Sequence, residues 1–291
     1  MIPAALRLIR PQQWTKNAFC LAGLFFSGRF LDSGAILNAA IVFATFCAAS
    51  SVVYVGNDLR DVERDRAHPR KRLRPLPSGS VSKSAAIMIM LLLLAGVVFG
   101  ALATNARTGA CLGLYLAINA VYTLSWKHEP ILDVTCIASG FVLRLLAGVF
   151  AIGELPTTWI TLCTLFLALF LGFAKRRAEL AAQHNGGDST QRPVLRRYSI
   201  VLLDSLLNST ATMAVMSYAL FTVLSNKDST LVATVPFVVY GVMHYKFVVM
   251  AGDSAEEPDR MLLNDRRLQL CIAGWLVVYL AVVMLKPGLF R

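Results

Sequence analysis

Residues 35–65 read AILNAAIVFATFCAASSVVYVGNDLRDVERD, an apolar run that ends in a dense group of charged side chains. The apolar part, residues 35–56, has the length that a helix needs to cross a bilayer, which is roughly 20 residues. The polar part starts with carboxylates and passes into a basic run that proline and glycine close. This stretch therefore predicts a membrane helix that carries a cluster of oxygen-bearing side chains to the membrane surface.

The apolar pattern recurs along the whole chain of 291 residues. Charged residues make up only 15% of the sequence, whereas a soluble domain carries about 25%. We therefore predict an all-α fold in one domain, residues 1–291, built as a polytopic bundle of nine transmembrane helices. The predicted spans are 15–31, 35–56, 84–103, 109–126, 131–152, 157–175, 199–224, 231–250 and 267–286.

Basic residues are distributed unevenly between the two sides of this predicted bundle. With the N-terminus inside, 21 Lys and Arg residues fall on the cytoplasmic side and 5 on the other. Because cytoplasmic loops carry an excess of Lys and Arg, this bias predicts a multi-pass protein of the cell inner (plasma) membrane with a cytoplasmic N-terminus. Three long polar connections, 57–83, 176–198 and 251–266, then face the cytoplasm. The net charge of +11 is mostly explained by this topology and does not indicate a nucleic-acid partner.

The first long connection carries the side chains that favour a metal-bound diphosphate. If the helix continues through Asp65, then Asn57, Asp61 and Asp65 lie on one face at spacings of four residues, with Asp58 beside them. Carboxylates this close repel one another unless a cation joins them. Mg²⁺ prefers oxygen ligands and commonly binds through one or two carboxylates together with substrate phosphates. We therefore predict a cytoplasmic Mg²⁺ site, and with it the active site, at these four residues.

Basic residues near this cluster complete the predicted diphosphate site. Lys71, Arg72 and Arg74 follow the carboxylates and can bind the phosphate oxygens that the metal leaves open. A solvated connector is the plainer interpretation, but it does not explain this order of acids and bases. Lys16, with Trp14 nearby, is at the cytoplasmic start of the first span, where an interfacial anchor is the alternative interpretation.

Further basic residues lie at or within the later spans. Lys127, Lys175 and Arg176 fall on the predicted cytoplasmic side, where their side chains could also simply reach toward the interface. Arg144 lies well inside the fifth span. An arginine within a membrane is costly and is by default a functional candidate. A structural ion pair between Arg144 and Asp133 is the competing interpretation.

At these residues the sequence resembles the UbiA superfamily of intramembrane prenyltransferases. The resemblance implies nine transmembrane helices around a lipid-accessible cavity, capped by cytoplasmic loops. The first motif of that superfamily, N-D-x-x-D-x-x-x-D, is present here as Asn57, Asp58, Asp61 and Asp65. Aromatic prenyltransferases of the superfamily have a second motif, D-x-x-x-D. Here Ile137 stands four residues after Asp133, so the second acidic pair is missing.

Three stretches resemble one branch of the superfamily more specifically, the branch typified by decaprenyl-phosphate phosphoribosyltransferase. They are R-P-x-Q-W-x-K-N at residues 10–17, H-P-x-K-x-x-R-P-x-x-S-G at 68–79 and K-H-x-P-I-L-D-V at 127–134. This resemblance implies an Mg²⁺-dependent enzyme that moves 5-phosphoribose from 5-phosphoribosyl diphosphate (PRPP) to a polyprenyl, decaprenyl-like phosphate and releases diphosphate. The product would be a lipid-linked sugar precursor for cell-wall polysaccharide.

The resemblance also implies roles for the candidate residues. We expect the catalytic residues to be Asp58, Asp61 and Lys71. The residues expected to bind PRPP are Lys16, Tyr54, Lys71, Arg72 and Arg74. The lipid phosphate or the ribose 5-phosphate is expected to be held by Lys127, Arg144, Lys175 and Arg176. Because the acceptor phosphate is already anionic, no general base is required.

Two other functions remain open at this point. The first is a UbiA-type prenyltransferase that moves a prenyl group from a prenyl diphosphate to an aromatic acceptor, and the choice of donor distinguishes it. The second is a transporter or lipid flippase, against which the gathering of charge at one membrane surface counts. Small residues on several spans also permit a homo-oligomer.

Overall fold

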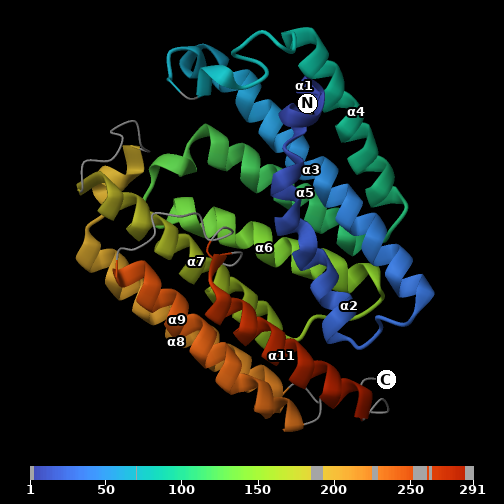
Figure 1. The fold of residues 1–291 in the computed structure, drawn as a ribbon. Helices are drawn as coiled ribbons and strands as arrows, with labels where there is room; N and C mark the ends of the chain where they lie inside the picture. The colour runs from blue at the N-terminus through green and yellow to red at the C-terminus, as the bar shows by residue number, and fades with distance from the viewer. Residues whose placement is uncertain are drawn as a thin grey trace. The chain divides into compact units, whose positions relative to one another are not determined.

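The computed structural model describes residues 3–69, 71–184, 193–224, 229–251, 261 and 264–285. These residues form ten α-helices and no strand, so the prediction of an all-α fold is confirmed (Figure 1). The α-helices are α1 (Ala4–Ile9), α2 (Ala22–Phe26), α3 (Ser33–Arg66), α4 (Lys83–Leu102), α5 (Ala106–Leu124), α6 (Leu132–Ala151), α7 (Thr158–His184), α8 (Ile200–Leu224), α9 (Val235–Ala251) and α11 (Arg266–Leu285). Short 3₁₀ helices lie between them: η1 (Pro11–Leu21), η2 (Lys71–Leu73), η3 (Trp126–His128), η4 (Pro193–Arg197) and η5 (Ser229–Thr234).

The predicted count of nine membrane spans is not confirmed. In the described part of the chain, seven helices are long and apolar enough to cross a membrane: α3, α4, α6, α7, α8, α9 together with η5, and α11. The span expected at 109–126 is helical, as α5, but Arg107 and Asn119 lower its mean hydropathy. The span expected at 15–31 is divided between η1 and α2.

One face of η1 packs against α3. In a 3₁₀ helix, residues three apart lie above one another. Trp14, Asn17 and Cys20 therefore share one face, and Asn17 and Cys20 are fully buried. Trp14 and Asn17 donate hydrogen bonds to Ser51 and Ser50 of α3, respectively. The polar contacts along this face stabilise the tighter geometry over eleven residues, which is long for a 3₁₀ helix.

The chain divides into two compact units, which are described separately. Unit 1 comprises Met1–Leu124 and Leu143–Leu155. Within it, α3 and α4 run side by side, and α5 packs against both (Figure 1). A Cβ at Gly100 of α4 would overlap the side chain of Thr45, so a glycine is required where α3 and α4 approach. The core between these helices is centred on Phe46 and Tyr115.

Helix α3 positions the acidic motif. Its N-cap is Asp32, whose side chain accepts a hydrogen bond from the Ala35 amide at 3.1 Å. The helix continues for 34 residues to Arg66, which confirms that it extends through Asp65. At 1.5 Å per residue it is roughly 51 Å long. A bilayer core is about 30 Å thick, so the last turns of α3 can reach beyond it.

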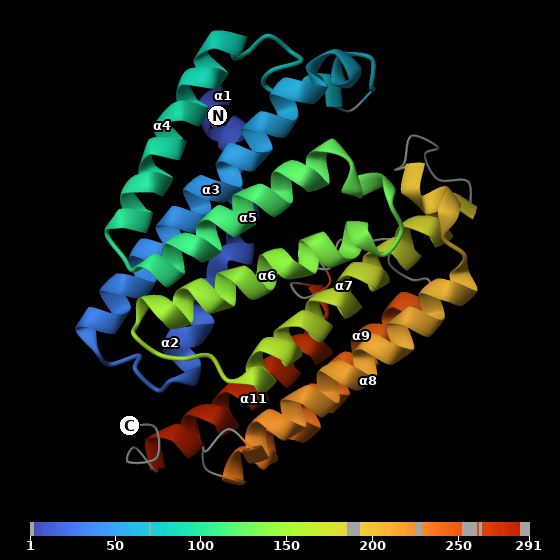
Figure 2. The ribbon, with the colours of Figure 1, turned by 180° about the vertical axis from the view of Figure 1, so that it is seen from behind.

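Unit 2 comprises Ser125–Val142 and Pro156–Arg291. Its helices α7 and α8 pack along one another, and α9 lies beside α8 (Figure 2). Phe170 of α7 and Tyr245 of α9 meet edge to face in its core. The start of the predicted polar connection 176–198 is helical, because α7 continues to His184 through good helix formers such as alanine, glutamate and leucine. Part of this connection, and most of the one predicted at 251–266, lies outside the described residues.

Candidate functional site

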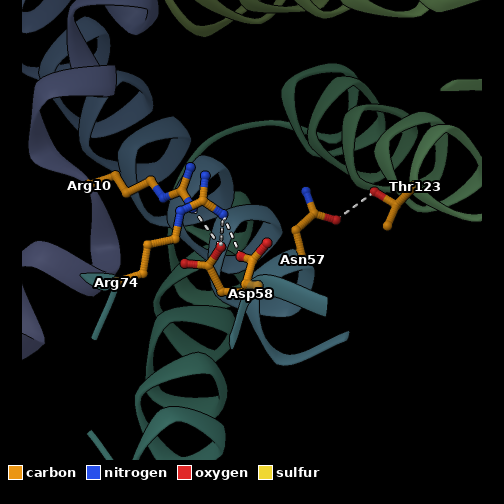
Figure 3. A network of polar contacts seen from close by, with 6 residues as sticks. Arg10, Asn57, Asp58, Arg74 and Thr123 are labelled. Atoms are coloured by element: carbon orange, nitrogen blue, oxygen red, sulfur yellow. Dashed lines mark hydrogen bonds and ion pairs between the residues drawn. The ribbon is translucent and has the colours of Figure 1, made fainter. Parts of the chain in front are cut away.

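Two carboxylates of the motif on α3 are buried against arginines. Arg10 binds Asp58 Oδ1 through Nη2 at 2.5 Å (Figure 3). Arg74 Nη1 lies 2.7 Å from Asp65 Oδ2 and 3.4 Å from Asp58 Oδ1. Asp58 and Asp65 are only 3% and 2% exposed, whereas both arginines are partly exposed. The arginines therefore connect a buried acidic face of α3 to the protein surface.

The seven-residue spacing explains why one arginine reaches both acids. Residues seven apart lie two turns apart on the same helix face, so Asp58 and Asp65 point in the same direction. Two unpaired carboxylates buried in this way would be strongly destabilising. Arg74 bridges them, and Arg10 supplies a second cation to Asp58. The Arg10 guanidinium also lies 5.1 Å from the centre of the Tyr54 ring, a favourable cation–π geometry.

The other two motif residues face a different environment. Asn57 Oδ1 accepts a hydrogen bond from Thr123 Oγ1 of α5 at 2.7 Å (Figure 3). Asp61 is half-buried, and its carboxylate has no hydrogen bond or ion pair with any of the described residues. Asn57 and Asp61 lie one helical turn apart, about 6 Å between Cβ atoms. They therefore offer a carboxamide and a carboxylate on neighbouring turns.

These residues are chemically suited to a metal that arrives with its substrate. No group of three or more His, Cys, Asp or Glu side chains among the described residues could by itself hold a metal ion. Mg²⁺ at phosphate-transfer sites typically uses one or two carboxylates, and takes its other ligands from phosphates and water. The oxygen donors of Asn57 and Asp61 fit that requirement, whereas Asp58 and Asp65 are already occupied by arginines.

The basic run after α3 is anchored close to the motif. Lys71 and Arg72 lie in η2, where Lys71 is half-buried and Arg72 is exposed. The Lys71 amide donates to His68 Nδ1 at 3.3 Å. Leu76, which is 2% exposed, packs into the cluster that contains Val62 of α3. Lys71 and Arg72 therefore belong to a folded segment that also presents Arg74 to the acids.

Lys16 and Arg144 have separate surroundings within unit 1. Lys16 Nζ donates to Gln13 Oε1 at 2.8 Å within η1. Arg144, which is 7% exposed, donates to Asn17 Oδ1 at 2.7 Å and to Tyr115 Oη at 3.1 Å. It also lies 5.7 Å from the centre of the Phe46 ring. The guanidinium joins η1 to the helices of unit 1.

Arg144, a residue of α6, contacts α3 at Phe46, well before the acidic motif. Phe46 precedes Asp58 by twelve residues, which corresponds to roughly 18 Å along the helix axis. The structure therefore does not bring Arg144 to the acidic cluster of Asp58 and Asp65.

In unit 2 the predicted residues Arg176 and Asp133 form a buried ion pair. Arg176 Nε lies 2.7 Å from Asp133 Oδ2, and the two residues are 1% and 0% exposed. Arg176 Nη1 also binds Glu179 at 2.7 Å. Tyr198 donates its hydroxyl to Asp133 Oδ1 at 2.7 Å. The suggested pairing of Asp133 with Arg144 is thus wrong, because Arg176 occupies the carboxylate.

Lys127 and Lys175 flank this network in sequence. Lys127 lies in η3, and Lys175 precedes Arg176 in α7; both are half-buried.

Burial raises the pKa of the Tyr198 phenol above its ordinary value, so the hydroxyl remains protonated and can donate to Asp133.

Sequence reasoning did not assign roles to several residues that the structure brings into these networks. Arg10 is the first residue of the stretch R-P-x-Q-W-x-K-N, so its membership of that stretch could have marked it as a candidate site residue. Asn17 ends the same stretch, whereas Thr123 and Tyr198 are distant in sequence from their partners and no local spacing marks them.

Comparisons with known proteins agree on one family. The sequence model described as the UbiA prenyltransferase family matches residues 17–270. The chain is 33% identical to decaprenyl-phosphate phosphoribosyltransferase of Corynebacterium glutamicum, over 97% of this chain and 87% of that protein. It is 30% identical to the protein of the same name from Mycobacterium tuberculosis, over 97% of this chain and 95% of that protein. A solved UbiA homolog from Archaeoglobus fulgidus, bound to GPP and Mg²⁺, shares the fold with a TM-score of 0.73 at 20% identity, covering 97% of this chain and 99% of that one.

Proposed function

Because this chain belongs to the UbiA prenyltransferase family, we propose that it transfers 5-phosphoribose from PRPP to a polyprenyl phosphate and releases diphosphate. The observation that carries this proposal is the nearly full-length similarity to decaprenyl-phosphate phosphoribosyltransferases. The acidic and basic residues at the end of α3 supply the polar groups that a diphosphate substrate needs. The missing second acidic pair further favours this reaction over aromatic prenylation.

Asn57 and Asp61 would hold Mg²⁺ in this proposal. Their oxygens lie on neighbouring turns, and no arginine of the described chain occupies Asp61. When bound, Mg²⁺ would stabilise the negative charge of the departing diphosphate. The presence of Mg²⁺ in a solved structure of the same fold supports the choice of metal.

Basic residues around the motif would bind the diphosphate oxygens. Asp65 binds Arg74, and Asp58 binds Arg10. Both guanidinium groups are partly exposed and have additional N–H donors that could bind a phosphate. Asp58 would act on the reaction through these arginines. Lys71 would stabilise the negative charge of the leaving diphosphate. Arg72, Lys16 and Tyr54 would make further contacts with PRPP.

The transfer itself requires no proton movement by the protein. An oxygen of the acceptor phosphate attacks carbon 1 of the ribose and forms the new C–O bond. The bond from carbon 1 to the diphosphate breaks, and the diphosphate leaves with the electron pair. The acceptor is already anionic, so the protein contributes positioning and electrostatic stabilisation.

The second set of phosphate groups would be bound by other basic residues. In unit 2, Lys127 and Lys175 are the candidates for direct contact with the lipid phosphate or the ribose 5-phosphate. Arg176 and Arg144 are buried and hydrogen-bonded to the protein, so we assign them to positioning.

The seven apolar helices make the enzyme a multi-pass membrane protein. We place it in the inner membrane with its site on the cytoplasmic side, supplying a lipid-linked precursor of cell-wall polysaccharide.

A donor assay tests the proposal directly. Purified protein in detergent is given Mg²⁺, PRPP labelled in the ribose and a polyprenyl phosphate, and label is measured in the organic phase. We expect label that chelation by EDTA removes and added Mg²⁺ restores. Product from a prenyl diphosphate and an aromatic acceptor, with none from PRPP, would instead return the chain to the aromatic prenyltransferases.

A further inference from the structure

The segment between η3 and α6 contains a strained residue. Ile131 has a φ of 69°, and it is one of two described residues other than glycine with a positive φ. This left-handed region is unfavourable for a β-branched side chain. Such a conformation persists only where neighbouring groups hold it, and it is often found near functional sites. Ile131 lies four residues after Lys127.

One buried hydroxyl group holds the amide of this strained residue, while its carbonyl accepts from the Val134 and Thr135 amides of α6 at 3.1 and 2.8 Å. The Ile131 amide donates to Tyr198 Oη at 2.6 Å, and the same hydroxyl donates to Asp133 Oδ1 at 2.7 Å. Arg176 Nε completes the network at Asp133 Oδ2. Tyr198 is 6% exposed and Asp133 is fully buried, so water competes little for these bonds. Both the accepting and the donating capacity of the phenol are thus used.

A second attachment to the same segment is weaker. Arg197 donates to Glu129 Oε2 at 2.9 Å and to the His128 carbonyl at 3.3 Å. The Arg197 and Glu129 side chains are 57% and 52% exposed. Exposed ion pairs contribute little to stability. Of the contacts that residues 197 and 198 make with the segment, the buried hydrogen bond of Tyr198 is therefore the stronger restraint.

We propose that Tyr198 is a positioning residue that locks the backbone at Ile131 and thereby places Lys127 for the phosphate group it binds. The role given to Lys127 rests on the proposed function, whereas the lock at Ile131 does not. The phenol itself is buried against protein groups and acts through the segment 127–131. Asp133, whose other carboxylate oxygen is bound by Arg176, anchors the Tyr198 hydroxyl.

The first test removes only the hydroxyl. In Tyr198→Phe we expect kcat/KM for phosphoribosyl transfer to fall by roughly ten- to a hundredfold, as is typical when a binding group shifts slightly. Hydrogen exchange of the amides in 127–131 should become faster, because Ile131 loses its hydrogen-bond acceptor. Tyr218→Phe is the matched control. Tyr218 is 4% exposed, and its hydroxyl also makes two buried contacts, with Thr234 and Trp275.

The second test relieves the strain instead of restoring the hydroxyl. Asparagine tolerates positive φ, and the Ile131 side chain is 46% exposed, so Ile131→Asn costs little packing. In the Tyr198→Phe background, we expect Ile131→Asn to recover most of the lost kcat/KM. The double variant Lys127→Ala/Tyr198→Phe should have the same kcat/KM as Lys127→Ala alone. Both changes remove the same contribution, the phosphate contact of Lys127, so their effects should not add.

The outcomes separate the lock from the reaction. Unchanged exchange at 127–131 in Tyr198→Phe would overturn the lock, even in a protein without transferase activity. An equal loss of kcat/KM in Tyr218→Phe, absence of rescue by Ile131→Asn, or additive losses with Lys127→Ala would overturn the positioning role. If wild-type protein fails to use PRPP while Tyr198→Phe still accelerates exchange, the proposed function fails and the lock stands.

Discussion

The four residues of the acidic motif differ in their surroundings, although the sequence presents them as equivalent ligands. Asp58 and Asp65 are buried and paired with arginines, whereas Asp61 has no such partner among the described residues. A buried carboxylate that balances an arginine stabilises the fold, and a half-buried carboxylate without a partner is available to a metal. The same motif therefore combines a structural task with a ligand-binding one.

Substitution of two aspartates should separate these tasks. Asp61→Asn should abolish Mg²⁺-dependent transfer and change the free energy of unfolding by less than about 1 kcal/mol, since no ion pair is lost. Asp58→Asn should destabilise the protein by about 3 kcal/mol, because Arg10 and Arg74 lose a buried counter-charge. Unfolding in detergent and the labelled-PRPP assay measure the two effects. Equal destabilisation by both changes would contradict the division of roles.

At the scale of elements, the site depends on the uninterrupted end of α3. The helix holds Asp58 and Asp65 two turns apart, so that Arg74 reaches both acids. Continuation of the helix could be anticipated from the spacing of the motif. The 3₁₀ geometry of η1 could not, because it depends on contacts of Trp14 and Asn17 with α3.

A proline within the last turns of α3 should break the site. Glu63→Pro removes a backbone hydrogen bond and clashes with the carbonyl of the preceding turn, at a cost of about 3 kcal/mol or more. We expect transfer activity to be lost, because Asp65 and Arg74 move away from Asp58. The Glu63 side chain is exposed and its own ion pairs contribute little.

Ser33→Pro is the matched control in the same helix. Ser33 is the first residue of α3, where proline is favourable, and Asp32 before it has the extended backbone that proline requires. Activity and thermal unfolding in detergent should remain close to wild type. If Glu63→Pro behaved in the same way, continuity of α3 would not be needed for the site.

At the scale of the whole molecule, the proposed orientation predicts that two exposed positions of unit 1 are accessible from opposite sides of the membrane. Ser80 follows the basic run after α3, and Leu155, which is 72% exposed, follows α6. In the nine-span prediction, the bias of basic residues would put residue 80 on the cytoplasmic side and residue 155 on the other. Three crossings, by α4, α5 and α6, separate the two positions in the nine-span prediction, whereas only α4 and α6 would separate them if α5 did not cross the membrane, and both positions would then lie on the same side.

Cysteine labelling checks this orientation. In a background in which the six native cysteines are replaced, a membrane-impermeant maleimide should label Ser80→Cys in inverted vesicles. Leu155→Cys should react in right-side-out vesicles instead. Labelling of both positions from the same side would refute the assigned topology, whatever the enzymatic result.

The sequence alone determined the membrane class, the helical fold, the acidic motif and its family resemblance. These properties follow from composition and from spacings of three or four residues, which set neighbours on a single helix. Only the tertiary structure decided which charge meets which: Arg10 reaches Asp58 across 48 residues, Arg176 reaches Asp133 across 43, and Tyr198 reaches Ile131 across 67. Such pairs form because separate elements pack together, and the burial that makes them strong arises only from that packing.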